Sequence, residues 1–230
     1  MNPQRQSLSI PVAIIIAGVL IAFGLYWSGR GTAIQKPSPA AQAPSLSSID
    51  PIGPDDHVLG NPNAAIVLVE YSDIECPYCK QFHSTLSALM KEYGSKAQLA
   101  WAFRHYPVHN NSVKEGEATE CAAELGGNDA FWRYLDKIFA ATPSNDGLDL
   151  STLPVLAKEV GIDEARFNEC LASGKHKARI LKDKDDVTAA GAQGTPYSVL
   201  FVNSQRIPIT QGALPYEDMK NIIDTILKNL

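Results

Sequence analysis

Residues 70–83, "EYSDIECPYCKQFH", place two cysteines, Cys76 and Cys79, directly after an apolar run. The run, residues 65–71 with the sequence "AIVLVEY", has the length and the β-branched content of a strand that is covered on both faces. After the cysteines, large apolar side chains recur at the spacing of one helix face, at Phe82, Leu86, Leu89 and Met90. The cysteine pair is therefore expected at the junction between a buried strand and an amphipathic helix.

The segment that follows completes a strand–helix–strand unit. Gly94 is expected to stop the helix, with Lys91 in its last turn. Residues 98–104, "QLAWAFR", then show the alternation of a strand. Two strands joined by a helix in this order form a right-handed βαβ unit, which puts the cysteines at the N-terminus of the helix.

Residues 105–190 change character and are predicted to be a helical insertion. Ser112 and Glu115 have the spacing of a capping box at the start of the first helix. Glycines then mark the ends of three helices, at Gly126-Gly127, Gly161 and Gly174.

The C-terminal part is predicted to be a β-hairpin and a helix. Residues 197–202 and 207–210 read as strands on either side of a turn at residues 203–206, and Pro208 places the second strand at a sheet edge. A final amphipathic helix is expected to start near Pro215. The fold class that these elements indicate is α/β.

The position of Cys76 favours thiol chemistry. Cys76 occupies the expected N-cap of the helix, and Pro77 falls at the first helical position, where its missing N–H costs nothing. The free N–H groups and the helix dipole stabilise a thiolate at Cys76, while Cys79 lies one turn deeper. Such an asymmetric pair suits thiol–disulfide exchange, with Cys76 as nucleophile and Cys79 as resolving thiol.

The charged residues near Cys76 affect its thiolate in opposite ways. Asp73 and Glu75 oppose a thiolate, whereas Lys80 favours it.

Two other uses of the cysteine pair compete with exchange. A zinc site would use Cys76, Cys79 and His83, but it needs a fourth ligand, and the remaining cysteines form no second close pair. A purely structural bridge across so short a loop would constrain little of the unfolded chain. The sequence thus favours redox chemistry and predicts no metal and no cofactor.

The strand ending in "EYSDIECPYC", the helical insertion and the later "GTPYSVLFVN" together resemble the DsbA family of thioredoxin-fold proteins, in particular its membrane-anchored members. The resemblance covers about residue 65 to the C-terminus. It implies a central mixed sheet flanked by helices, an inserted helical subdomain, and a cis-proline loop at Thr195-Pro196 beside the active-site sulfurs. The chain departs from the best-known oxidases of the family at Tyr78, where they have histidine.

The other two cysteines, Cys121 and Cys170, each fall on an apolar helix face. They are either buried thiols or, as an exported compartment would favour, a disulfide. His105 and His109 are four residues apart, but Pro107 prevents the helical turn that would align them as metal ligands.

The N-terminal region is expected to anchor and tether the domain. Residues 10–27 carry no charge and are long enough to span a membrane, with a cleaved signal peptide as the alternative. Residues 1–9 would then be a cytoplasmic tail, and residues 28–56, rich in Pro, Ala and Ser, a flexible linker. The catalytic domain, residues 57–230, would lie on the periplasmic or extracytoplasmic side of the inner membrane.

The function that these observations favour is a thiol–disulfide oxidoreductase that donates disulfides to exported polypeptides. A reductase or isomerase of the same fold, and a non-catalytic metal-binding module using Cys76 and Cys79, are the alternatives. The expected partners are unfolded or partly folded exported proteins and a membrane redox partner that recycles the disulfide. A formal net charge of −5 and the absence of a basic stripe argue against nucleic acid.

Overall fold

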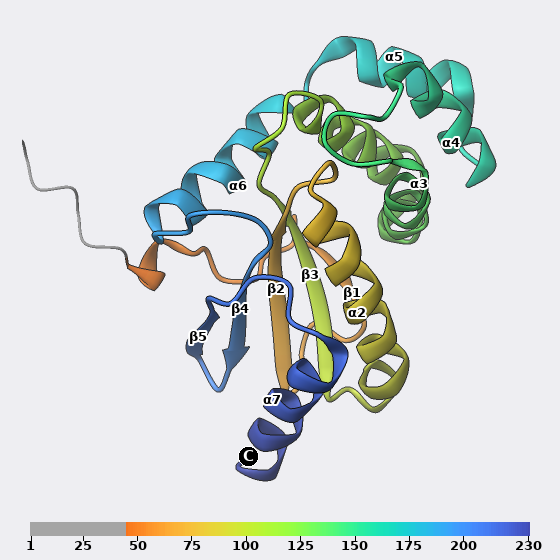
Figure 1. Cartoon of the computed structure of the whole chain (residues 1–230). Coiled ribbons are helices and arrows are strands. Elements are labelled where there is room, and N and C mark those ends of the chain that lie inside the picture. Colours follow the sequence, from red (N-terminus) through yellow and green to blue (C-terminus); the bar gives the residue numbers. More distant parts are fainter. Residues whose placement is uncertain (1–44) are drawn as a thin grey trace, which may run out of the picture. The chain divides into compact units, whose positions relative to one another are not determined.

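The computed structural model describes residues 45–230, which form a five-stranded sheet with helices on both faces (Figure 1). The strand order is β1-β3-β2-β4-β5. The strands are β1 (His57–Leu59), β2 (Ile66–Ser72), β3 (Leu99–His105), β4 (Tyr197–Val202) and β5 (Gln205–Ile209). The predicted central sheet and the helical segment between β3 and β4 are both present.

Strands β2 and β3 are parallel to each other, and β1 and β4 run antiparallel to them. The edge strand β5 is antiparallel to β4 and so runs in the same direction as β2. Strand β2 pairs in parallel with β3 and antiparallel with β4, and every residue of β2 and β3 is buried. The parallel pair is joined by α2 (Pro77–Tyr93) and a short 3-10 turn, η2 (Gly94–Lys96), as expected for a βαβ unit. Pro208 lies in the edge strand β5, as predicted, because a central strand would require its missing N–H.

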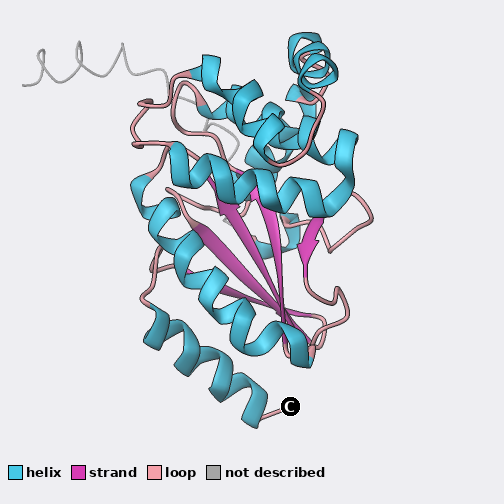
Figure 2. Cartoon of the chain, turned by 90° about the vertical axis from the view of Figure 1, so that its right-hand side faces the viewer, coloured by secondary structure: helices cyan, strands magenta, loops and turns pink. Residues whose placement is uncertain are grey.

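The helices form two layers and a separate group (Figures 1 and 2). On one face of the sheet, α2 and α7 (Tyr216–Lys228) pack over the larger apolar cluster, which includes both Cys76 and Cys79. On the other face, α6 (Lys177–Ala189) covers a smaller cluster that contains Tyr71 and Val199. Three helices gather beyond one end of the sheet: α3 (Ser112–Ala141), α4 (Leu153–Glu159) and α5 (Glu164–Ser173).

Within the helical segment, Gly127 interrupts α3 at the predicted position. Its φ of 76° and ψ of −173° break the helix into two parts, a conformation that glycine adopts without a Cβ penalty. A 3-10 turn, η3 (Leu150–Thr152), precedes α4, and Gly174 caps α5 with a φ of 64°.

Two local predictions were wrong. Ser112 and Glu115 form no capping box, because the N-cap of α3 is Asn111 and the Ser112 hydroxyl bonds instead to Asp73. The β4–β5 hairpin turns at Asn203 and Ser204 alone, both with positive φ, because Val202 already pairs with Gln205.

The predicted end of α2 is confirmed. Gly94 is its C-cap, in right-handed helical geometry, and Lys91 lies in the last turn. The left-handed residue that then turns the chain is Ala97, with a φ of 54°.

The folded domain begins before the expected boundary at residue 57. Ile49 is fully buried in the smaller apolar cluster, so the later part of the expected linker packs on the sheet. The buried Arg104 guanidinium holds this segment, donating to both carboxylate oxygens of Asp56, at 2.7 and 2.9 Å, and to the carbonyls of Asp50 and Pro51.

The predicted tail at residues 1–9, the predicted anchor at residues 10–27 and the first part of the predicted linker lie outside the described residues. Among the helices of residues 45–230, none is both long enough and apolar enough to cross a membrane.

Candidate active site

Cys76 and Cys79 lie at the first turn of α2, directly beyond the C-terminal end of β2. Cys76 is the N-cap residue and Pro77 the first helical residue, as predicted. Both cysteines are free thiols; Cys76 retains 5% exposure, whereas Cys79 has none. Between them, Tyr78 is 64% exposed. A reagent or substrate can therefore approach the pair only from the side of Cys76 and Tyr78.

The environment of Cys76 stabilises its thiolate. A hydrogen bond from the Cys79 thiol acts most strongly, and contacts with Thr195 and with the backbone N–H groups of Cys79 and Tyr78 add to it. Burial opposes these contacts, but together they lower the pKa of Cys76 to about 6. The N–H groups that contribute are the unpaired donors of a helix N-terminus, the source that the sequence indicated.

Cys79 is shifted in the opposite direction. Burial raises the pKa of the Cys79 thiol well above its usual value, and the neighbouring Cys76 and Glu70 add to the rise. The backbone N–H of Asp73 lies 3.4 Å from its sulfur. The two sulfurs thus differ in the way that exchange requires, one ionised near the surface and the other protonated beneath it.

The loop before β4 faces the outer cysteine. The peptide bond between Thr195 and Pro196 is cis, and the sulfur of Cys76 lies 3.5 Å from the carbonyl oxygen of Thr195. Thr195 is partly exposed and Pro196 is buried. The fold therefore brings all four residues predicted for the site, Cys76, Cys79, Thr195 and Pro196, to the same end of the sheet.

A fifth group, Glu70, was missed by the sequence analysis. It is fully buried in β2, and its carboxylate accepts a hydrogen bond of 3.0 Å from the indole N–H of Trp101. Burial raises the pKa of Glu70 to about 8, against the lowering effect of Ser72 and Trp101, and the charge of Cys76 adds to the rise. A glutamate inside the otherwise apolar run "AIVLVEY" was the available indication.

The charged residues beside the cysteines hold loops. The carboxylate of Asp73 accepts from the backbone N–H groups of Val108 and His109 and from the Ser112 hydroxyl, at 2.5 to 3.0 Å. The carboxylate of Glu75 accepts from Thr142, Gly147 and Leu148 at 2.9 to 3.2 Å. Lys80 donates to the carbonyls of Ala140 and Thr142.

The contacts of Asp73, Glu75 and Lys80 join the segment around the cysteines to both ends of α3.

Glu75 also lies next to the buried Glu115. Burial and the nearby Glu75 raise the pKa of Glu115 to about 9. A protonated Glu115 can therefore lie beside the Glu75 carboxylate without a second negative charge.

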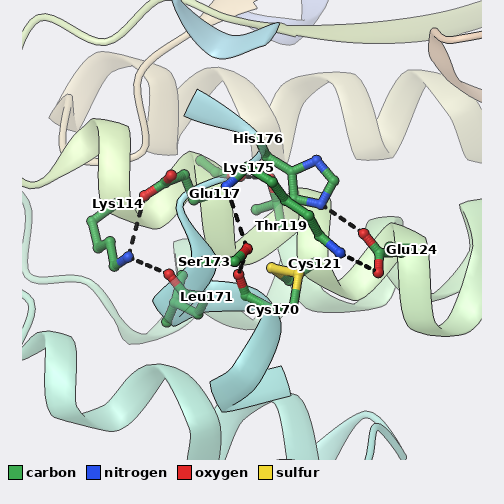
Figure 3. Close-up of a disulfide and its surroundings, with 11 residues drawn as sticks. Lys114, Glu117, Thr119, Cys121, Glu124, Cys170, Leu171, Ser173, Lys175 and His176 are labelled. Carbon is green, nitrogen blue, oxygen red and sulfur yellow. Dashed lines mark hydrogen bonds and ion pairs between the residues drawn. A yellow bond between two sulfur atoms is a disulfide. The ribbon is translucent and has the colours of Figure 1, made fainter. Parts of the chain in front are cut away.

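A disulfide joins Cys121 of α3 to Cys170 of α5 (Figure 3). The sulfurs are 2.03 Å apart, and the two cysteines are 49 positions apart in the chain. On one side of the bridge, Lys175 and His176 pair with Glu124, at 2.7 and 3.1 Å.

The histidines considered as ligands lie in different places. His83 pairs with Asp136 at 2.7 Å, with its ring against Trp101 and Phe139. His105 bonds to Glu120 at 3.0 Å, whereas His109 lies 3.2 Å from Asp73.

Comparison with known protein families shows which family this fold and site belong to. A family model described as Thioredoxin matches residues 53–225, three quarters of the chain. The chain belongs to this thioredoxin family. The match includes the cysteine pair, the helical segment and the Thr195–Pro196 loop.

Solved structures with the same thioredoxin-type architecture are DsbA-type proteins. BdbD of Bacillus subtilis, in its oxidised form, superposes with a TM-score of 0.66 and is 25% identical, covering 80% of this chain and 96% of that one. α-DsbA1 of Wolbachia pipientis has a TM-score of 0.67 at 22% identity, with the same coverage. The mixed sheet with inserted helices is thus the DsbA form of the thioredoxin fold.

The curated relatives are longer proteins. A Na⁺/H⁺ antiporter, NhaA 3 of Salinispora tropica, is 37% identical over 160 residues, which are 68% of this chain but 23% of the relative. The chain therefore spans about a quarter of the length of this relative.

Proposed function

We propose that this chain is a thiol–disulfide oxidoreductase that exchanges disulfides through Cys76 and Cys79. The observation that carries the proposal is the pair itself: a Cys76 thiol with a pKa lowered to about 6, directly above a fully buried Cys79. At neutral pH most of Cys76 is ionised in the reduced protein, and the thiolate is the form that attacks or leaves in exchange.

The exchange transfers two electrons between sulfur atoms and needs no cofactor. A substrate thiolate attacks the Cys76 sulfur of the Cys76–Cys79 disulfide, and Cys79 leaves as a thiolate that takes up a proton. A second substrate thiolate then attacks the mixed disulfide at the substrate sulfur, and Cys76 leaves as a thiolate. The substrate gains one disulfide, and the protein keeps both electrons as two reduced cysteines.

The direction of transfer follows from the stability of the reduced form. Contacts that stabilise the Cys76 thiolate stabilise the reduced protein, which makes the disulfide a stronger oxidant. Asp73 and Glu75 were expected to work against this, but their carboxylates are bonded to backbone N–H groups of the helical segment. We therefore assign the chain as a disulfide donor.

Glu70 supplies the proton that the leaving Cys79 requires. With a pKa of about 8, its carboxyl is mostly protonated at neutral pH, and it lies close enough to Cys79 to raise the pKa of that thiol. A buried acid with a pKa near the working pH is suited to give and take a proton in every cycle.

Substrate binds at the surface that Tyr78 and the Thr195–Pro196 loop present beside Cys76. Because exchange requires only an accessible thiol and an extended segment, the proposed substrates are unfolded or partly folded exported polypeptides. A membrane redox partner would reoxidise the pair, and residues 10–27 would anchor the domain on the extracytoplasmic side of the inner membrane. The antiport activity in the relatives' name is not proposed for this chain.

Equilibration of residues 45–230 with glutathione buffers tests the proposal, with Cys76→Ser as the matched inactive variant. The expected midpoint lies well above that of thioredoxin, about −270 mV. A midpoint at or below that value would make the chain a reductase. A tightly bound metal that survives dialysis, together with no reversible couple, would instead support the metal-binding module.

A further inference from the structure

Three buried polar atoms near the candidate active site make no hydrogen bond of good geometry among residues 45–230, although the Ser72 hydroxyl lies near enough to the Glu70 carboxyl to lower its pKa. They are the second carboxylate oxygen of Glu70, Oε1, and the hydroxyl oxygens of Ser72 and Ser198. Glu70 is fully buried, and the two serines are at most 2% exposed. Burying a hydroxyl without a partner is unfavourable, so three such atoms in one place need an explanation.

The sheet places these three side chains together. Glu70 of β2 is directly opposite Ser198 of β4 in the antiparallel register, so their side chains share one face at a Cβ separation of about 5 Å. Ser72 lies on the same face, two residues along β2 from Glu70. Leu68 and Leu200, which belong to the same rows, pack in the cluster that contains Cys79.

Ser72 lies between Glu70 and the cysteine end of the sheet, whereas Ser198 is level with Glu70 on the neighbouring strand. Ser72 directly precedes Asp73, whose backbone N–H lies 3.4 Å from the Cys79 sulfur. Ser198 is two residues beyond Pro196, in the strand that follows the loop beside Cys76. Within residues 45–230, no direct hydrogen bond joins the Glu70 carboxyl to Cys79, although their charges interact.

A hydroxyl can pass a proton only if it can both donate and accept. A serine held by a permanent partner is fixed in one orientation, whereas an unpartnered hydroxyl can rotate and do both. Glu70 has no exposed surface, so each proton that it gives to Cys79 or recovers from solvent must cross neighbouring groups.

We propose that Ser72 and Ser198 are positioning residues that relay protons between the buried Glu70 carboxyl, Cys79 and the Thr195–Pro196 end of the sheet. The inference rests on the proposed exchange function and adds the path of its proton. When Cys79 leaves as a thiolate, the Ser72 hydroxyl donates its proton to Cys79 and accepts one from Glu70, which becomes a carboxylate. Glu70 then recovers a proton from the solvent side through Ser198, so no net charge is left inside.

If the serines had a purely structural role, removing their hydroxyls would lower the stability of the fold. A relay predicts instead that the fold stays as stable or becomes more stable, because the unfavourable burial of a hydroxyl without a partner is relieved. A relay acts on rates in both directions equally, so its loss should slow exchange without moving the reduction potential. Slower exchange at unchanged stability and unchanged potential is therefore the result that distinguishes a relay.

The test compares Thr and Val at each serine, since the two differ by one hydroxyl at nearly the same shape. In residues 45–230, Ser198→Thr and Ser72→Thr should exchange with dithiothreitol at close to the wild-type rate. The double Val variant should be slower by about tenfold or more, within the roughly 10²–10⁴-fold that a positioned proton donor contributes. Its rate should also lose the pH dependence near pH 8 that the wild type derives from Glu70. Thr119→Val serves as the control, because the Thr119 hydroxyl is buried but bonded to the carbonyl of Gly116, away from the site.

Equal rates and equal pH profiles for the Thr and Val variants, in a wild-type protein that exchanges normally, would overturn the relay and leave the function intact. A loss of rate that follows a loss of stability in urea would also overturn it, as a structural effect. A wild-type domain whose cysteines do not exchange with thiols at all would remove the proposed function itself.

Discussion

The sulfur of Cys76 lies 3.5 Å from the carbonyl oxygen of Thr195, although the two residues are 119 positions apart in the chain. Cys76 caps the helix that follows β2, and Thr195 lies in the loop before β4, so the pairing of β2 with β4 brings them together. The contact leaves one side of Cys76 covered by backbone and the other beside the exposed Tyr78.

The reactivity of Cys76 should follow its lowered pKa. In the reduced domain, iodoacetamide should modify Cys76 with a rate that rises through a midpoint near pH 6, because only the thiolate reacts. Cys79 should react far more slowly over the same range, since burial raises its pKa. Mass spectrometry of peptides after timed quenching measures both rates; equal rates at the two cysteines would contradict their assigned roles.

The same pKa predicts a difference in stability between the redox forms. The pKa of Cys76 is depressed in the folded state, so its thiolate contributes to the free energy of unfolding of the reduced protein. This contribution is complete above the unfolded pKa near 9 and is lost as the pH falls through about 6. The oxidised form has no such group. Thermal unfolding of both forms should be measured from pH 5 to 9. With rising pH, the stability of the reduced form should increase relative to that of the oxidised form. If the stability of the two forms changed with pH in parallel, the result would contradict a stabilised thiolate.

Glu70 makes the opposite contribution, since its pKa is raised in the folded state. The stability that its neutral form provides is complete below about pH 4.5 and is lost as the pH rises through about 8. Over that range the loss should approach 5 kcal/mol, at about 1.4 kcal/mol per unit of pKa. Glu70→Gln should abolish this loss in urea titrations and slow exchange through Cys79. A Gln variant with the wild-type pH profile would show that Glu70 does not titrate in this range.

The Cys121–Cys170 disulfide should stabilise the helical segment without taking part in exchange. It closes a loop of about 50 residues, for which chain entropy gives about 4 kcal/mol. Replacing both cysteines by alanine should lower the free energy of unfolding by up to that amount, while Cys76 alkylation keeps its rate and pH midpoint. A changed midpoint for Cys76 would instead indicate coupling between the two cysteine pairs.

Arg104 should be required for residues 49–56 to remain packed against the sheet. Burial alone would raise the pKa of Asp56, but bonds from Arg104 lower it, so both groups are charged and paired inside. Arg104→Met leaves the Asp56 carboxylate unpaired and should cost about 3–5 kcal/mol. Limited proteolysis should then cut near residues 50–56, and Asp56→Leu in the same chain should recover part of the stability. Resistance to proteolysis in Arg104→Met would contradict this fastening role.

The sequence alone determined the elements whose causes are local. The apolar run before the cysteines, the helical spacing after them and Pro77 at the first helical position depend on residues within a few turns of each other. The helix N-terminus that lowers the pKa of Cys76 is part of the same local pattern, so the nucleophile could be named in advance.

Only the tertiary structure decided the groups whose roles depend on residues far apart in the chain. Glu70 is a titrating acid because the packed sheet and helices bury it completely, and the same residue in an exposed strand would be an ordinary carboxylate. From the sequence, Asp73 and Glu75 were expected to oppose the thiolate because of their charge. In the structure their carboxylates are hydrogen-bonded to residues 35 or more positions later in the chain. The early start of the domain at Ile49 likewise depends on Arg104 in β3. Burial and pairing change the charge and the pKa of a side chain, and both are set by the packing of distant segments.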